Sequence, residues 1–442
     1  MFNTSGPRVA IIGGGYAGFA AAITLARAGA RITLFEASRT LGGRARVVDT
    51  DGHRVDNGQH ILLGAYHETL GLLRQIGVKP RVLDHRRLAL VYPGVCSLRA
   101  APLPAPLHLA LGLLGAKGLG WRDKKAMLGL MQTLKKTGYQ RPATETVAEL
   151  LASTRQTDAL TRLIWDPLCV AALNTPIQRA SARVFAAVLR DSLGGAAADS
   201  ELLIPRVDLS ELLPVPATRW LAMRGHGVRT SEPIRGLRRD ADSQEWILDG
   251  DDGGTRYAHV IVATAPYHAS KLLQPFPSLA PLITQLDALR YEPITTLWLG
   301  FEGPLSFPEP MIGLTGGYGQ WAFDRSSAEP GLVSVVISAS GAHQDLNHDA
   351  LTVAVLTELS RALGPLPTLG WSRVITEKRA TFACTPGIQR PDVLTPEPGL
   401  WLAGDYTASD YPATLESAVR SGTRAAQGVM EVCGLRVGKI WE

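Results

Sequence analysis

The first apolar run of the chain is short and leads directly into glycines. Residues 9–12 are Val-Ala-Ile-Ile, residues 13–18 contain four glycines, an Ala-rich stretch reaches Ala28, and a second apolar run covers residues 32–35. This pattern predicts strand, turn, helix and strand. Gly29 is expected to end the helix, because glycine readily takes the left-handed conformation that follows many helices. We therefore expect residues 8–36 to form a βαβ unit.

Two later regions repeat parts of this pattern. Residues 245–248 and 257–265 flank Asp251-Asp252-Gly253-Gly254, which favours a hairpin that returns as a buried strand at residues 259–263 and could join the first sheet. Residues 399–403 predict a short strand, and residues 413–432 predict a helix with Leu415, Val419 and Val429 on its apolar side. The second region is therefore again strand, turn and helix.

Composition narrows the class of protein. The apolar fraction of 45% and the charged fraction of 19% are those of an ordinary globular protein. The four cysteines lie far apart without a C-x-x-C pair, which argues against a disulfide framework or a metal knuckle and favours a reducing cytoplasm. The net charge of +5 could favour anionic lipid or aid solubility, and alone it does not indicate nucleic acid. We expect neither a signal peptide nor a membrane-spanning helix.

The glycine turn has the spacing of a dinucleotide fingerprint. Gly13, Gly15 and Gly18 form G-x-G-x-x-G between the predicted strand and helix. Gly13 permits the tight turn, Gly15 lets a pyrophosphate approach the backbone, and Gly18 allows close packing of helix and strand. Glu36 ends the second predicted strand, where a carboxylate accepts hydrogen bonds from a ribose. The segment predicts a dinucleotide site.

The next segment separates FAD from NAD. Gly42 and Gly43 let a second loop approach the pyrophosphate, and Arg44 supplies a positive charge. A simple NAD dehydrogenase does not need such a loop. The sequence therefore favours FAD as the cofactor.

These motifs, followed by Gly404-Asp405, resemble the signature of the flavin amine oxidase and phytoene desaturase superfamily. The resemblance implies that Asp405 accepts from the ribityl chain, that Val228 lies against the adenine, and that the 413–432 helix points its N-terminus at the flavin pyrimidine edge. The FAD-binding residues expected from the motifs and the resemblance are Gly13, Gly15, Tyr16, Ala17, Gly18, Glu36, Ala37, Gly42, Gly43, Arg44, Gly58, Gln59, His60, Val228, Ala263, Thr264, Gly404, Asp405, Pro412, Ala413 and Thr414.

The expected fold class is α/β, with a Rossmann-type FAD-binding domain of the glutathione reductase-like type and an inserted α+β domain. A chain of 442 residues exceeds what one hydrophobic core usually serves, so we expect two domains. The FAD-binding domain is expected to be discontinuous, from residues 1–65, 215–268 and 385–442. Residues 66–214, mainly helical in pattern, and residues 269–384 are expected to form the substrate-binding domain, with helices that could face a membrane.

Segments outside the nucleotide motifs are similar to those of hydroxysqualene dehydroxylases. They are residues 56–60, 165–169, 171–176, 377–382 and 412–414. The resemblance implies that reduced FAD donates hydride to hydroxysqualene, a C30 allylic alcohol of the bacterial hopanoid route, and that squalene is the product. The sequence does not name the electron donor that reduces FAD, because it holds only one dinucleotide fingerprint.

Three residues are candidates for the proton transfer that this reaction needs. His60 follows the loop expected beside the flavin and can be cationic near neutral pH. Asp166 and Lys378 lie inside family-like segments. The alternatives are that His60 only hydrogen-bonds flavin or backbone, and that Asp166 and Lys378 form structural ion pairs. No metal site is expected.

A lipid substrate implies contact with a membrane. Residues 124–136 place Met127, Leu130, Met131 and Leu134 at helical spacing between pairs of lysines, so this helix could rest on an anionic membrane or could dock on the protein core. We expect a cytoplasmic protein held peripherally at the inner face of the cytoplasmic membrane. Other functions that fit are a carotenoid-type desaturase, a flavin amine oxidase, which an aromatic cage would favour, and a non-catalytic prenyl-lipid carrier.

Overall fold

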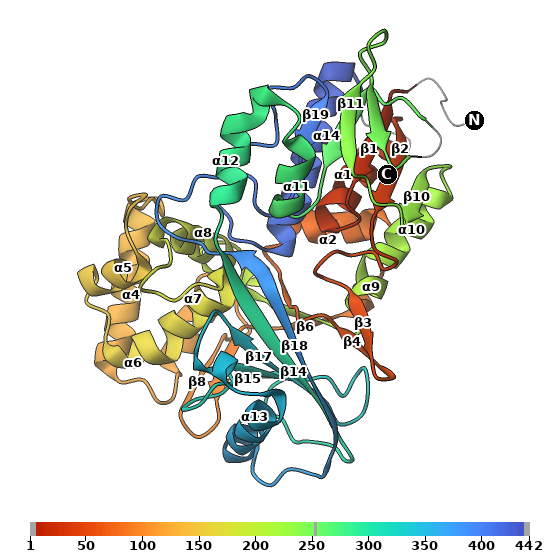
Figure 1. Ribbon diagram of the computed structural model, residues 1–442. Helices are drawn as coiled ribbons and strands as arrows, with labels where there is room; N and C mark the ends of the chain where they lie inside the picture. Colours follow the sequence, from red (N-terminus) through yellow and green to blue (C-terminus); the bar gives the residue numbers. More distant parts are fainter. Residues whose placement is uncertain (1–5, 252–253, 437–442) are drawn as a thin grey trace.

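A five-stranded parallel sheet forms one end of the molecule (Figure 1). The computed structural model describes residues 6–251 and 254–436. The strand order of this sheet is β10-β2-β1-β13-β19, and every neighbouring pair is parallel. The strands are β1 (Arg8–Ile12), β2 (Arg31–Glu36), β10 (Gly227–Thr230), β13 (His259–Val262) and β19 (Leu400–Leu402). The βαβ unit predicted at residues 8–36 is confirmed as β1, α1 (Tyr16–Arg27) and β2.

The two faces of this sheet are buried by different elements, because side chains alternate along a strand. Ile11 and Ile261 pack in one apolar cluster with residues of α1 and α14 (Leu415–Cys433). Ile12 and Val262 pack in another cluster with residues of α11 (Pro266–Leu273). A parallel sheet covered on both faces explains why its strands read as continuous apolar runs.

The predicted hairpin has a different partner strand. β12 (Trp246–Asp249) pairs antiparallel with β11 (Gly236–Arg239), and β13 joins the parallel sheet beside β1. Only one bridge, Trp246 with Tyr257, connects the two predicted arms, through backbone bonds of 2.7 and 2.9 Å. The residues 252 and 253 of the predicted turn lie outside the described residues.

A five-stranded antiparallel sheet occupies the other end, and its long strands β14 and β18 run between the two ends (Figure 1). Its order is β15-β16-β17-β14-β18. The strands are β14 (Tyr291–Phe301), β15 (Met311–Gly313), β16 (Trp321–Asp324), β17 (Leu332–Ser338) and β18 (Leu369–Phe382). Leu351, Val355 and Leu359 of α13 (His348–Leu363) pack on this sheet. These strands all lie within residues 269–384, the second segment of the expected substrate-binding domain.

Helices dominate the segment between residues 107 and 193. They are α3 (Leu107–Leu114), α4 (Trp121–Lys136), α5 (Val147–Ser153), α6 (Asp158–Leu160), a π-turn (Thr161–Trp165), α7 (Asp166–Leu173) and α8 (Ala182–Leu193). Met127, Leu130 and Leu134 of α4 are buried in the main apolar cluster. The apolar side of residues 124–136 therefore docks on the core, which was one of the two alternatives.

Shorter elements connect these parts. The helices are α2 (His67–Gln75), α9 (Leu209–Leu212), α10 (Pro214–Ala222) and α12 (Ala280–Ala288). The strands are β3 (Val47–Thr50), β4 (His53–Asp56), β5 (Leu62–Leu63), β6 (Leu83–Arg86), β7 (Ala89–Tyr92), β8 (Cys96–Arg99) and β9 (Leu202–Pro205). Among the described residues, no helix has the length and apolar character that crossing a membrane requires. The division into two domains at the stated boundaries stays a prediction.

Candidate cofactor-binding site

The glycine turn after β1 is shaped by contacts that exclude side chains. Gly13 has φ 117°, and a Cβ on it would lie 2.5 Å from the Ala263 carbonyl oxygen. A Cβ on Gly18 would lie 2.0 Å from the Gly13 carbonyl oxygen. Beside Gly15 there is more room, since the nearest atom of another segment to a Cβ there is the Gly43 Cα at 4.0 Å. The turn thus packs tightly on β13 and leaves space between the two glycine loops, where a pyrophosphate would fit.

The N-terminus of α1 faces this space without a capping side chain. Its N-cap is Gly15, which makes no side-chain capping bond, and its first turn holds no acidic residue. Unpaired N–H groups and the helix dipole make such an end a binding site for anions. Tyr16 and Ala17, the first two residues of α1, are buried beneath it.

Glu36 is fixed at the same edge of the sheet. Its Oε2 accepts a hydrogen bond from the Gly14 N–H at 2.8 Å, and its Oε1 accepts from the Ser38 N–H at 2.8 Å. Ala37 follows it and is exposed. A carboxylate held at the end of β2 is positioned to accept from ribose hydroxyls.

Three other predicted cofactor residues lie in or directly after strands of the same sheet. Val228 pairs with Leu34 in β2. Ala263 directly follows β13, and its N–H donates to the Ile12 carbonyl oxygen at 2.8 Å, with Thr264 next in the chain. Ligands of parallel α/β sheets bind at this edge, so the placement fits the adenine end of a dinucleotide.

A salt bridge joins the N-terminal and C-terminal motifs. Arg44 donates from Nη2 to Oδ2 of Asp405 at 2.6 Å, and the Asp405 side chain is only 9% exposed. A second guanidinium nitrogen of Arg44 donates to the Ala380 carbonyl oxygen. Gly42 and Gly43 reach this position with φ of 110° and 62°, and Gly404 with φ of 156°. Two segments that lie far apart in the chain thus meet in one place.

The C-terminal helix is anchored beside the same place. Its N-cap is Thr414, whose hydroxyl accepts from the Ser417 N–H at 3.1 Å. Ser421 accepts from the Gly404 N–H at 2.7 Å, so the helix holds the Gly-Asp turn directly. Pro412 and Ala413 lead into the helix at buried and partly buried positions. The positive end of the α14 dipole thus lies next to the turn that carries Asp405.

The segment at residues 56–60 contacts the antiparallel sheet, α9 and the Arg44 loop. The Asp56 carboxyl is buried and accepts from the Leu209 N–H at 2.8 Å, and burial raises its pKa to about 7. The Asn57 amide donates to the Arg44 carbonyl and to Glu377 of β18, each at 3.3 Å. Gln59 accepts from the Ser334 hydroxyl at 3.0 Å. The Asp56 carboxyl therefore binds the start of α9. Asn57 was missed as a site residue although it lies in the same motif.

His60 is held in a defined protonation state. Its Nδ1 lies 2.9 Å from the Gly58 carbonyl oxygen, which can only accept, so Nδ1 carries a proton. Burial, with the nearby positive charge of Arg44 as a smaller cause, lowers the pKa of His60. The ring is therefore harder to protonate near neutral pH than a free imidazole. Its role as the acid stays a prediction.

Asp166 and Lys378 have different surroundings. Asp166 begins α7 directly after the π-turn, and its Oδ1 is buried without a hydrogen-bond partner within the described structure. Burial raises the pKa of Asp166. Lys378 is exposed on β18. No hydrogen bond or ion pair between described residues joins any two of His60, Asp166 and Lys378, and their catalytic roles stay predictions.

An aromatic pair beside Arg44 was not predicted from the sequence. The rings of Tyr267 and Tyr291 meet edge to face at 6.0 Å, and the Arg379 guanidinium lies 4.3 Å and 5.7 Å from their centroids. These residues line a pocket of about 290 Å³ together with Leu286, Asp287, Leu289 and Arg290. Arg379 immediately precedes Ala380, whose carbonyl oxygen accepts from Arg44. Its place in the family-like segment 377–382 was the sequence signal that could have identified it.

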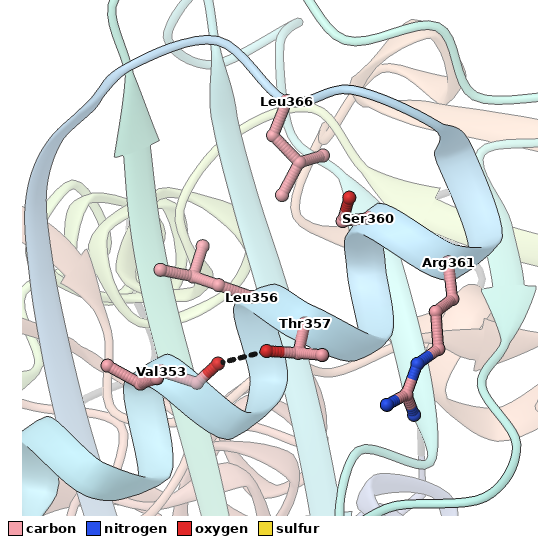
Figure 2. Close-up of a pocket in the computed structure, with 6 residues that line it drawn as sticks. All are labelled: Val353, Leu356, Thr357, Ser360, Arg361 and Leu366. Carbon is pink, nitrogen blue, oxygen red and sulfur yellow. Dashed lines mark hydrogen bonds between the residues drawn. The ribbon is translucent and has the colours of Figure 1, made fainter.

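A second pocket lies on α13, away from the predicted residues. Figure 2 shows its lining side chains, which lie on α13 and on the loop after it. Within α13, the Thr357 hydroxyl donates to the Val353 carbonyl oxygen. None of the predicted site residues lines it. Within the described part of the chain, no group of three or more His, Cys, Asp or Glu side chains could hold a metal ion.

Comparisons with known proteins agree with this geometry. The family model of flavin-containing amine oxidoreductases matches residues 16–430. A hydroxysqualene dehydroxylase of Rhodopseudomonas palustris is 32% identical, with 96% of this chain and 98% of the relative covered. A hydroxysqualene dehydroxylase of Sinorhizobium fredii is 29% identical, with 95% and 97% covered.

The fold is also similar to that of solved structures. Cyclohexylamine oxidase of Brevibacterium oxydans superposes with a TM-score of 0.70 at 19% identity, over 97% of this chain and all of that chain. At this identity the likeness shows the fold alone. It confirms the expected fold class, an α/β dinucleotide-binding fold with an inserted α+β part.

Proposed function

This chain is a member of the family of flavin-containing amine oxidoreductases, and from that premise we propose that it catalyses the FAD-dependent reductive dehydroxylation of hydroxysqualene to squalene. The protein is an FAD-dependent oxidoreductase. One observation carries the flavin site: the Arg44–Asp405 pair brings the glycine turn, the Gly-Gly-Arg loop and the C-terminal Gly-Asp motif together. The similarity to hydroxysqualene dehydroxylases over nearly the whole chain, insertions included, supports the substrate class.

Several residues are placed to hold FAD. The N-terminus of α1 would receive the pyrophosphate, Glu36 the ribose, and Asp405 the ribityl hydroxyls. When bound and reduced, FAD supplies the hydride that replaces the hydroxyl group of the substrate. The positive end of α14 would stabilise negative charge at the pyrimidine edge.

The reaction also needs a proton, because the hydroxyl group must leave as water. A group that donates this proton must be protonated at working pH and shielded from solvent. The directions of the pKa shifts favour Asp166 over His60, since burial raises the pKa of Asp166 and lowers the pKa of the His60 ring. We therefore place Asp166 first as the proton donor, with His60 as a hydrogen-bonding residue of the flavin loop.

The aromatic pair weighs against an amine substrate. An aromatic cage binds a cationic ligand through the faces of its rings. Arg379 already places a positive charge over Tyr267 and next to Tyr291. A second cation there would be repelled, so this pair is not a free amine cage.

The substrate is a C30 hydrocarbon chain that partitions into bilayers, so the proposal includes peripheral contact of the protein with the inner face of the cytoplasmic membrane. The protein then collects its substrate from lipid and returns the product to lipid. No nucleic acid takes part.

Anaerobic turnover tests the proposal. The purified protein, reduced with dithionite, is mixed with hydroxysqualene in detergent, and flavin absorbance and squalene are followed together. The expected result is reoxidation of the flavin with one squalene formed per flavin. Flavin that stays reduced, or that reoxidises without squalene, would overturn the reaction assignment.

A pair of variants separates the two proton donors. Asp166→Asn is expected to slow squalene formation by about a hundredfold or more, while His60→Gln has a smaller effect. Both variants should retain FAD, as measured by flavin absorbance. Equal rates for Asp166→Asn and the unchanged protein would exclude Asp166 as the donor.

A further inference from the structure

We propose that a surface formed by α3 and the start of α4 inserts into the interfacial layer of an anionic lipid bilayer. This inference rests on the proposed lipid substrate and goes beyond it by assigning the part of the molecule that meets the membrane. The docking surface consists of Val95, Leu103, Leu107, Leu111, Leu114 and Trp121.

Exposed large apolar side chains concentrate in this part of the described chain. Seven of the eleven such side chains lie between residues 95 and 128. Trp121 is 75% exposed and Leu107 is 54% exposed. Scattered single apolar residues are normal on a protein surface, whereas a contiguous patch marks an interaction site.

The geometry of α3 places its leucines on one face. Leu107, Leu111 and Leu114 are four and three residues apart, so they line one side of the helix, and all three are exposed. His108 and Leu113 on the other side are buried. The helix is therefore apolar on both sides, with one side directed outward and the other packed on the protein.

Contacts between loops make the surface continuous. Lys117 exchanges backbone hydrogen bonds with Ser97, and a Cβ on Gly118 would lie 2.2 Å from the Val95 carbonyl oxygen. Lys124 donates from Nζ to the Leu114 carbonyl at 2.7 Å, and its Nζ lies 5.3 Å from the Trp121 ring centroid. Val95, the end of α3 and Trp121 are thus held next to one another.

The charges around the surface complement anionic lipid. No Asp or Glu occurs between residues 85 and 122. The exposed cations include Arg87, Lys117, Arg122 and Lys125, and Lys125 shares the outer side of α4 with Trp121 and Leu128. Arg86 and Arg99 are exposed as well and pair with Asp84 and Glu309. Leucines, a tryptophan and a basic rim are the composition of segments that lie in the membrane interface. A protein partner would not need this excess of basic over acidic side chains, so the charge pattern favours lipid.

The surface differs from the one expected from the sequence. The apolar side of residues 124–136 is buried in the core. The helix α4 therefore contributes to the docking surface through its first residue, Trp121, and through its outer side.

Vesicle binding tests the inference without reference to activity. The holoenzyme is sedimented with phosphatidylcholine vesicles that contain about 30% phosphatidylglycerol, at low salt. The variant Leu107→Ser/Leu111→Ser/Leu114→Ser should lower the partition coefficient by about a hundredfold. The control Met223→Ser/Val353→Ser changes two side chains that are 71% and 63% exposed elsewhere and should bind like the unchanged protein.

Charge is tested separately. Lys117→Glu/Lys125→Glu should weaken binding to the anionic vesicles by about tenfold or more at low salt, because each basic residue near the surface contributes independently. Loss of binding in the control variant, or equal binding by the triple serine variant, would overturn the assignment of the surface.

Turnover of hydroxysqualene in detergent distinguishes this inference from the proposed function. If the unchanged protein makes squalene in detergent but does not bind vesicles, the membrane surface is wrong and the reaction stands. If it binds vesicles through the leucines but makes no squalene, the surface stands and the reaction is wrong. The triple serine variant should keep its detergent activity, which also shows that it folds.

Discussion

At the scale of single residues, the proposed flavin site depends on one ion pair between distant parts of the chain. Arg44 and Asp405 are 361 positions apart and lie 2.6 Å from each other. The Arg44 side chain is partly exposed, so the ion pair adds little to the stability of the fold. Its main effect is to hold the two segments in position. Arg44 also binds the Ala380 carbonyl oxygen, which fixes the orientation of its planar group.

Replacing Arg44 by lysine should weaken FAD binding. Lysine keeps the positive charge but lacks the planar guanidinium group. It therefore cannot donate to Asp405, to the Ala380 carbonyl and to a phosphate at the same time. We expect the dissociation constant of FAD to rise by about tenfold or more. Fluorescence titration of apoprotein with FAD measures it. Arg54→Lys, a 61% exposed residue paired with Asp208, is the control and should bind FAD normally.

Asp56 should make stability depend on pH. Burial raises the pKa of Asp56 to about 7 in the folded protein, above the usual value of about 3.9 in an unfolded chain. Between these two values the folded protein holds the extra proton, so the free energy of unfolding falls as pH rises, by up to about 1.4 kcal/mol per unit. Above pH 7 the Asp56 carboxyl is ionised in both states, so the free energy of unfolding falls no further through this group.

Asp56→Asn removes this pH dependence and keeps an oxygen for the Leu209 N–H bond. We expect the variant to gain stability relative to the unchanged protein as pH rises from 5 to 8. Urea unfolding at several pH values measures the difference. Parallel stability curves for the two proteins over that range would contradict the prediction.

Local chemistry let the sequence predict some of these residues. The glycines at 13, 15 and 18 and the carboxylate at 36 act through backbone geometry and spacing, which the sequence contains directly. The protonation of His60 depends on burial and on Arg44, and the free Oδ1 of Asp166 depends on what packs around α7. Such states arise from tertiary contacts, so sequence spacing could not predict them.

At the scale of elements, α1 and α14 form the support of the flavin site. A Cβ on Gly422 of α14 would lie 2.1 Å from the Ala17 carbonyl oxygen of α1. The two helices therefore cross at a glycine, and their starts both face the cofactor site. The sequence predicted both helices because their apolar periodicity is local. It did not predict that β12 pairs with β11, because strand pairing depends on partners that local alternation does not specify.

Gly422→Ala should force these helices apart. The close atom belongs to the backbone of α1 and cannot move without the helix, so we expect a loss of about 1–3 kcal/mol in the free energy of unfolding and a lower flavin content. Gly129→Ala in α4 is the matched control, since no atom lies within 4 Å of its added Cβ. It should raise stability by about 0.5–1 kcal/mol through helix propensity. Chemical denaturation and the flavin absorbance of both variants give the comparison.

At the scale of the whole molecule, the cofactor site is built from strands that span most of the chain. The parallel sheet takes its strands from residues 8–12 to residues 400–402, and the antiparallel sheet is formed between them. The sequence predicted this interleaving from the order of its motifs. The membrane-facing surface proposed for α3 was not predicted, because which side of α4 is buried depends on the packing of the helical segment.

Bound FAD should therefore stabilise the whole molecule. A ligand at a concentration of about a thousand times its dissociation constant adds about 4 kcal/mol to the free energy of unfolding. We expect the melting temperature of the apoprotein to rise steadily with added FAD, and Arg44→Lys to need more FAD for the same rise. Calorimetry over a range of FAD concentrations checks this. A melting temperature independent of FAD would show that the nucleotide does not link these segments.

The late position of β19 and of Asp405 has a consequence for synthesis on the ribosome. A nascent chain contains the glycine fingerprint and Arg44 within its first few dozen residues. Asp405, the partner of Arg44, is added 361 residues after Arg44. Because domains fold as their segments emerge, a growing or truncated chain has half of a nucleotide site and no means of closing it. Yellow colour in the cell should thus mark finished molecules, and unfinished ones should reach the proteases without flavin.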